Sequence, residues 1–315
     1  MVHNDKYLAL YILSPTQALL LCSILAILLV ASLYIWALAG YEVSNRNDPT
    51  VIKQRFISVV VWCLICPIII AQYVHVVDPH LIHRNGIIKD KVKNPLTQDT
   101  GFIDTLLSMV FWESLGVRLD IAHNIKSVLV SIGLNLLWFY GPLVEDWQYV
   151  LIHQHKDTPP LHVIRGFIIG PAAEEWIYRC CICSVLLNSG FNQAFSIIIS
   201  PILFGLSHAH HFYYQYSTVH AAEEKNIRKI FLSVLLQLTY TSIFGGVAAI
   251  IFAKTRNCFA PVVMHAMCNY MSLPRFSWVR FKSQKDYLNC AAYVFGLFSF
   301  LFLLFSLDPR TFSGV

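Results

Sequence analysis

Long apolar blocks determine what this chain can fold into. A helix of about 20 apolar residues spans the hydrocarbon core of a bilayer. In lipid the backbone polar groups must bond to one another, which leaves helices or closed barrels. Eight apolar blocks occur here: Gln17–Tyr41, Phe56–Val77, Ile125–Val144, Leu161–Asn188, Phe191–His211, Ile230–Ala253, Phe259–Met271 and Asn289–Leu307. The sequence therefore predicts an all-α polytopic membrane protein with seven to eight transmembrane helices.

Composition agrees with this class. Of 315 residues, 56% are hydrophobic and 13% are charged, whereas soluble domains are nearer a quarter charged. The net charge of +5 is small and scattered, so no nucleic-acid partner is expected. Nine cysteines show no framework spacing, and Cys63-x-x-Cys66 and Cys180-Cys181-x-Cys183 lie in apolar blocks. We interpret these as packing residues rather than redox or metal sites.

One apolar block carries charge where a membrane helix should have none. It contains Gly170-Pro171, then Glu174 and Glu175, then Arg179. Ionisable groups inside a bilayer are costly and mark functional sites. Glu175 and Arg179 are spaced i,i+4, which predicts an ion pair, and Glu174 lies about 100° around the helix, free of that pair. Gly170-Pro171 predicts a helix break or start.

A tight turn brings a histidine level with Glu174. The turn at Ser189-Gly190 makes the flanking blocks an antiparallel hairpin. Glu174 precedes this turn by about 15 residues and His208 follows it by about 18. At about 1.5 Å per residue, the two side chains are expected at nearly one membrane depth.

A second hairpin adds two more polar groups. It turns at residues 254–257, and its second arm carries His265 and Asn269 on one helix face, directed toward the same side as His208. We expect four residues to line one intramembrane cavity: Glu174, His208, His265 and Asn269.

This set suits the attack of water on an amide. A desolvated carboxylate helped by a histidine can deprotonate water, and a second histidine with an asparagine can stabilise the oxyanion. Zinc is an alternative, because Glu174, His208 and His265 form a ligand set found in catalytic zinc sites. A proton-coupled transporter would also bury Glu, His and Arg. A non-catalytic scaffold of the same fold would tolerate the loss of Glu174. Asn269 would then serve helix–helix contact.

The motifs match a known pattern. Glu174-Glu175-x-x-x-Arg179, Phe204-x-x-x-His208 and His265-x-x-x-Asn269, in this order, resemble the three motifs of the type II CAAX prenyl endopeptidases. The contexts Phe204–His211 and His265–Pro274 resemble the eukaryotic branch in particular. The resemblance covers about residues 164–274.

The resemblance implies a role for each motif residue. Glu174 would be the general base and His208 would assist it, while His265 and Asn269 would form the oxyanion site and Glu175 and Arg179 would orient the group. No cofactor is implied, with zinc as the minority alternative. The chain is divided accordingly into N-terminal helices (1–160), a catalytic core (161–274) and a basic interfacial loop with the last helix (275–315).

The resemblance also implies substrates and a location. The enzyme would remove the last three residues of farnesylated or geranylgeranylated CAAX proteins, such as Ras-type GTPases and prenylated peptide pheromones. It would lie in the endoplasmic reticulum membrane with its active site open to the cytosol. Positive charge does not decide the orientation, because the basic residues divide almost evenly between the two sides.

Overall fold

The computed structural model describes residues 8–43, 45–77, 101–218 and 227–312. The chain divides into two compact units. The first comprises residues 1–118 and 176–250, and the second comprises residues 119–175 and 251–315. The predicted division at residues 160 and 274 followed motifs rather than packing, and it stays a prediction.

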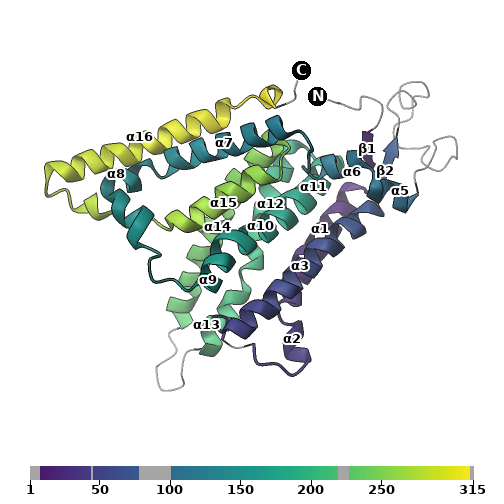
Figure 1. Cartoon of the computed structure of the whole chain (residues 1–315), viewed down its shortest axis with the longest axis horizontal. Coiled ribbons are helices and arrows are strands. Elements are labelled where there is room, and N and C mark those ends of the chain that lie inside the picture. The colour runs from purple at the N-terminus through teal and green to yellow at the C-terminus, as the bar shows by residue number, and fades with distance from the viewer. Residues whose placement is uncertain (1–7, 44, 78–100, 219–226, 313–315) are drawn as a thin grey trace. The chain divides into compact units, whose positions relative to one another are not determined.

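Capped apolar helices build the first unit (Figure 1). Ser14 forms a capping box with Gln17 at the start of α1, and the Asp48 side chain accepts two backbone N–H groups at the start of α3. Both helices have proline in their first turn, where its missing N–H costs nothing. The helices of this unit are α1 (Pro15–Ser32), α2 (Ile35–Leu38), α3 (Pro49–Ala71), α5 (Phe102–Leu107), α6 (Met109–Ser114), η3 (Trp176–Cys183), α11 (Ser184–Asn188), α12 (Gln193–Ser207), α13 (His210–Thr218) and most of α14 (Ile227–Thr255).

A small sheet was not predicted. Strands β1 (Leu8–Tyr11) and β2 (Val74–Val77) pair antiparallel, with Leu8 opposite Val77. Valine is common in strands because its branched side chain packs well on a pleated surface. The four-residue strands leave the fold essentially all-α, as predicted.

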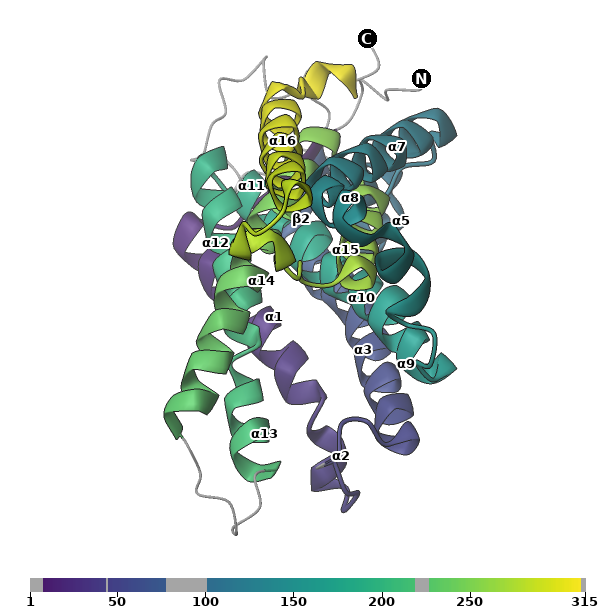
Figure 2. The same cartoon turned by 90° about the vertical axis from the view of Figure 1, so that its left-hand side faces the viewer.

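Three helices form the framework of the second unit. Helices α7 (Ile121–Trp138), α15 (Phe259–Met271) and α16 (Gln284–Ser306) lie side by side, as Figures 1 and 2 show. The buried Asn135 of α7 donates from Nδ2 to the Met264 carbonyl of α15 over 3.3 Å. The remaining elements are α8 (Tyr140–Gln148), η1 (Tyr149–His153), α9 (Pro160–Ile164), η2 (Arg165–Ile169), α10 (Gly170–Glu175), η4 (Ser277–Arg280) and η5 (Pro309–Thr311).

Six helical segments in the described ranges are long and apolar enough to cross a membrane: Pro15–Ser32, Pro49–Ala71, Ile121–Trp138, Gln193–Phe212, Ile227–Thr255 and Gln284–Ser306. The chain is thus a multi-pass membrane protein, and the predicted seven to eight spans were a slight overcount. Helix α15 has 13 residues, or about 20 Å, which is shorter than a hydrocarbon core. The charged block forms a series of short helical segments.

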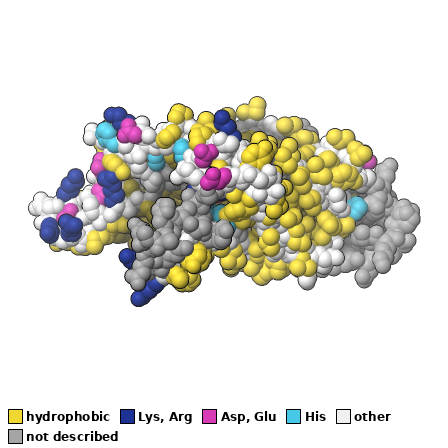
Figure 3. Space-filling model, turned by 90° about the horizontal axis from the view of Figure 1, so that it is seen from below, with side chains coloured by type: hydrophobic (Ala, Val, Ile, Leu, Met, Phe, Trp, Pro, Cys, Tyr) yellow, Lys and Arg dark blue, Asp and Glu magenta, His cyan; other side chains and the backbone are white. Residues whose placement is uncertain are grey.

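The spans carry their apolar side chains outward. On α16, Phe298 and Phe302 are 67% and 70% exposed, whereas Phe300 and Leu304 are buried. Hydrophobic side chains cover broad parts of the surface seen in Figure 3, and charged ones gather in separate groups. Exposed apolar area on this scale is unusual for a soluble protein and is what lipid contact requires.

Candidate active site

The charged block is helical throughout, from Pro160 to Asn188. Of the predicted helix break or start at Gly170-Pro171, the start is confirmed, because α10 begins at Gly170, and the chain is helical on both sides of it. In the π-helical turn η2, the Gly170 N–H reaches five residues back to the Arg165 carbonyl. The next bond of this kind would join residue 171 to the Gly166 carbonyl, but Pro171 has no N–H to donate. The backbone of η2 therefore stays helical, but the Gly166 carbonyl does not receive this hydrogen bond.

Asn269 supplies that donor. Its side-chain Nδ2 donates to the Gly166 carbonyl over 2.9 Å, which links α15 to η2. A primary amide carries two N–H groups, so one hydrogen is fixed by the backbone and the other stays available. Asn269 as a residue is exposed.

His265 lies between the two carboxylates of α10. Its Nδ1 is 2.7 Å from Glu175 Oε1, and its Nε2 is 3.8 Å from Glu174 Oε2. A carboxylate only accepts, so Nδ1 donates to Glu175 and Nε2 is directed to Glu174. Glu175 is fully buried, His265 is nearly so, and the Glu174 side chain is 35% exposed. The buried acid thus holds the imidazole, and the accessible acid is open to solvent or substrate.

His208 belongs to the first unit. It caps the C-terminal end of α12, and its Nδ1 donates to the Phe204 carbonyl over 3.0 Å. The other nitrogen, Nε2, is therefore the acceptor of the neutral ring. Its predicted approach to Glu174 joins the two units and stays a prediction.

Arg179 also belongs to the first unit, where it is completely buried. Its guanidinium carbon lies 4.6 Å from the centre of the Phe204 ring, a cation–π geometry. A Cβ on Gly245 of α14 would stand 3.0 Å from Arg179 Nη2, so glycine provides the space for the guanidinium. The predicted pair between Arg179 and Glu175 joins the two units and likewise stays a prediction.

The structure leaves the zinc alternative open. The described residues contain no group of three or more His, Cys, Asp or Glu placed to hold a metal ion. Glu174 and His265 would supply two ligands, and the third predicted ligand, His208, lies in the other unit. All nine cysteines are free. Those buried, as packing residues are, include Cys66, Cys180, Cys181 and Cys183.

Four predicted site residues thus meet in the second unit: Glu174, Glu175, His265 and Asn269. Sequence reasoning missed Gly166 and Gly245. Gly166 could have been found from its position five residues before a helical proline, and Gly245 from the Gly245-Gly246 pair inside an apolar helix.

Comparisons with known proteins agree with these motifs. Residues 156–271, which include all six predicted site residues, match the family model "Type II CAAX prenyl endopeptidase Rce1-like". The chain is 31% identical to "CAAX prenyl protease 2" of Arabidopsis thaliana over 65% of its own length and 72% of the relative's. It is 30% identical to "Probable CAAX prenyl protease 2" of Schizosaccharomyces pombe (78% and 77%) and 28% identical to human "CAAX prenyl protease 2" (93% and 82%). No solved structure matches the chain significantly.

Proposed function

Because the chain belongs to the type II CAAX prenyl endopeptidases and is therefore a CAAX protease, we propose that Glu174 is the base that activates water for peptide cleavage. The observation that carries this proposal is the arrangement around His265. A buried carboxylate holds one ring nitrogen at 2.7 Å, and the other nitrogen faces an accessible carboxylate at 3.8 Å. One water that donates to Glu174 and accepts from a protonated His265 Nε2, each over about 2.8 Å, fits such a separation.

The reaction begins with proton transfer from water to Glu174. The oxygen of that water attacks the carbonyl carbon of the prenylated cysteine, and the carbonyl oxygen becomes an oxyanion. His265 Nε2, when it carries a proton, and the second N–H of Asn269 donate to this oxygen. The tetrahedral intermediate then expels the amine of the next residue, which takes the proton from Glu174. The products are the cysteine carboxylate and a free tripeptide.

The other motif residues act around this step. His208 binds the attacking water with its Nε2 acceptor, since its Nδ1 donates to the Phe204 carbonyl. Glu175 positions His265, and Arg179 is a second positioning residue, held by the face of Phe204. Neither Glu175 nor Arg179 touches the reacting atoms in this proposal.

The membrane location fits the substrate. Each buried methylene of a prenyl chain adds about 0.8 kcal/mol of bilayer affinity, so farnesylated and geranylgeranylated CAAX proteins arrive within the membrane plane. Ras-type GTPases and prenylated peptide pheromones are of this kind. We include the endoplasmic reticulum membrane, with the site open to the cytosol, in the proposal.

The test is cleavage of a farnesylated CAAX peptide by membranes that hold the protein. Wild type should release the tripeptide, and Glu174→Gln should lower the rate by about 10²–10⁴-fold. Glu113→Gln, a partly exposed acid on α6, is the matched control and should cleave normally. Equal cleavage by Glu174→Gln and wild type would refute the assignment of the base.

A zinc chelator in the same assay decides the metal alternative. Activity that survives exhaustive chelation supports the metal-free mechanism. Activity lost on chelation and restored by zinc would instead assign Glu174, His208 and His265 as zinc ligands.

A further inference from the structure

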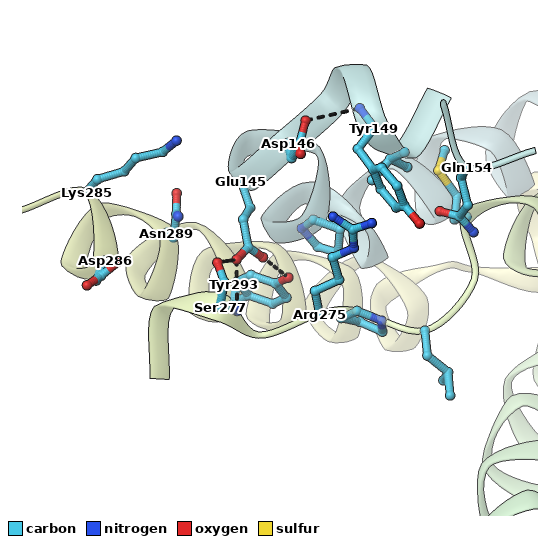
Figure 4. A pocket seen from close by; sticks show the side chains of 15 residues that line it. Glu145, Asp146, Tyr149, Gln154, Arg275, Ser277, Lys285, Asp286, Asn289 and Tyr293 are labelled. Atoms are coloured by element: carbon cyan, nitrogen blue, oxygen red, sulfur yellow. Dashed lines mark hydrogen bonds between the residues drawn. The ribbon is translucent and has the colours of Figure 1, made fainter. Parts of the chain in front are cut away.

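A polar pocket lies at the end of the helix that carries His265 and Asn269. Its volume is 250 Å³, and it lies within the second unit, between α8, the start of α16 and the segment after α15 (Figure 4). Part of its wall is apolar: Val150, Met271, Leu273 and Pro274. The mechanism above does not use this pocket.

The carboxylates of the pocket are already bound by protein donors. Glu145 accepts the Tyr293 hydroxyl at 2.6 Å, the Ser277 N–H at 2.9 Å and the Ser277 hydroxyl. Asp146 and Asp286 accept backbone N–H groups at the ends of their own helices. These carboxylates therefore hold together the segments that form the pocket wall. The dashed lines at Glu145 and Asp146 in Figure 4 mark such hydrogen bonds.

The cations of the pocket are not used in this way. Arg275 places its guanidinium carbon 3.0 Å from the centre of the Tyr149 ring, and Lys285 is exposed. Neither forms an ion pair with any carboxylate that the structure describes. Asn289 is only 4% exposed, lines the pocket one turn after Lys285, and has no side-chain hydrogen bond to a described residue. The lining holds three carboxylates and two cations, and the acids keep their charge. What the pocket offers to a ligand is therefore two cations without an ion pair to a described carboxylate and a buried amide, rather than a net positive charge.

The near wall of the pocket lies within the length of the cleaved peptide. Met271 lies six residues beyond His265 on α15, or about 9 Å along the helix axis. An extended tripeptide spans at most about 10 Å. The volume is just below the range of about 300–1,000 Å³ usual for small-molecule pockets, which suits a short peptide end better than a prenyl chain.

We propose that this pocket binds the free C-terminal end of the CAAX substrate. Arg275 pairs with the terminal carboxylate, Asn289 hydrogen-bonds the same end, and the apolar wall receives an aliphatic side chain of the tripeptide. This inference rests on the proposed function, because it takes His265 and Asn269 as the place of cleavage. It makes Arg275 a residue that selects substrates ending at the third residue after the cysteine.

The test compares one farnesylated CAAX peptide in two forms, with a C-terminal carboxylate or a carboxamide. Wild type should cleave the carboxamide with a kcat/KM about tenfold lower than that for the carboxylate. This is the effect expected from the loss of one charge-assisted hydrogen bond. Arg275→Gln should lose about tenfold on the carboxylate and little on the carboxamide. Asn289→Leu should weaken the same discrimination. Arg280→Gln, on the same segment but outside the pocket lining, is the matched control and should discriminate as wild type does.

Anionic lipid headgroups could also bind Arg275, so each assay is run in phosphatidylcholine vesicles with and without phosphatidylserine. An Arg275→Gln effect that appears only with phosphatidylserine overturns the proposal in favour of a lipid site. Equal cleavage of both peptides by wild type, or an equal loss on both by Arg275→Gln, also overturns it. Those outcomes leave the proposed function standing, whereas no cleavage of either peptide by wild type refutes the proposed function itself.

Discussion

Replacing Gly170 by alanine should displace the proposed base without changing its chemistry. A Cβ at this position would stand 2.6 Å from the Arg165 carbonyl oxygen, whereas ordinary contact begins at 3.4 Å. The neighbour is backbone, so the π-helical turn must move by about 0.8 Å. Glu174 lies one turn further along α10, and its distance to His265 Nε2 is only 3.8 Å.

The expected loss follows from that displacement. A misplacement of about 1 Å can cost on the order of 100-fold in rate, so Gly170→Ala should lower kcat/KM by about 10–100-fold. Overpacking should also lower the free energy of unfolding by about 1–3 kcal/mol. Tripeptide release and the midpoint of thermal unfolding in detergent measure the two effects separately.

Gly166→Ala is the matched control, because it lies four residues earlier in the same helix. No described atom lies within 4 Å of a Cβ there, and the variant keeps the carbonyl that binds Asn269. It should retain activity within about twofold, with a small gain in helix stability. If Gly170→Ala cleaves as fast as Gly166→Ala, the π-helical turn does not set the position of Glu174.

Three further substitutions test other contacts. Gly245→Ala should crowd Arg179, lower kcat/KM and cost about 1–3 kcal/mol of stability. Gly246→Ala should do neither, because no described atom lies within 4 Å of a Cβ there. Equal behaviour of the two variants would contradict the fit around Arg179. Glu175→Gln replaces the charge-assisted hydrogen bond to His265 by a neutral one, which loses about 1–1.5 kcal/mol. The kcat/KM should therefore fall about tenfold. An unchanged kcat/KM would show that the carboxylate does not position the imidazole ring. Asn135→Leu removes the bond from α7 to α15 and should cost about 1 kcal/mol in thermal unfolding, while a midpoint equal to that of wild type would show that the bond adds nothing.

Features contained within one helix could be predicted from the sequence. The long apolar spans follow from length and composition, and the i,i+4 spacing of His265 and Asn269 does place both on α15. The count of spans was too high because an apolar block of 13 residues can be buried in protein instead of crossing lipid. The buried Met264 and His265 of α15 show this use.

Features that depend on distant partners could not be predicted. The sequence predicts a helix break or start at Gly170-Pro171, but it does not show that the carbonyl left unbonded by Pro171 meets an amide about 100 residues later in the chain. Local spacing likewise predicted that Glu175 pairs with Arg179, which stays a prediction, and it did not report the histidine partner of Glu175 that lies 90 residues away. In both cases the hydrogen bond joins two helices. The residue periodicity within one helix cannot predict such a bond.

The bond from Asn269 to the Gly166 carbonyl has a consequence for how the enzyme can fail. Its acceptor is a main-chain carbonyl, so no side-chain change at position 166 can remove it. This carbonyl is open to Asn269 because Pro171 has no N–H to donate to it. The positions of the proposed base, Glu174, and of one oxyanion donor, Asn269, therefore both depend on the short backbone segment from η2 to α10. Loosening that piece would misplace both at once, so thermal inactivation should be an abrupt loss of turnover, in step with the separation of α15 from η2, rather than a gradual decline.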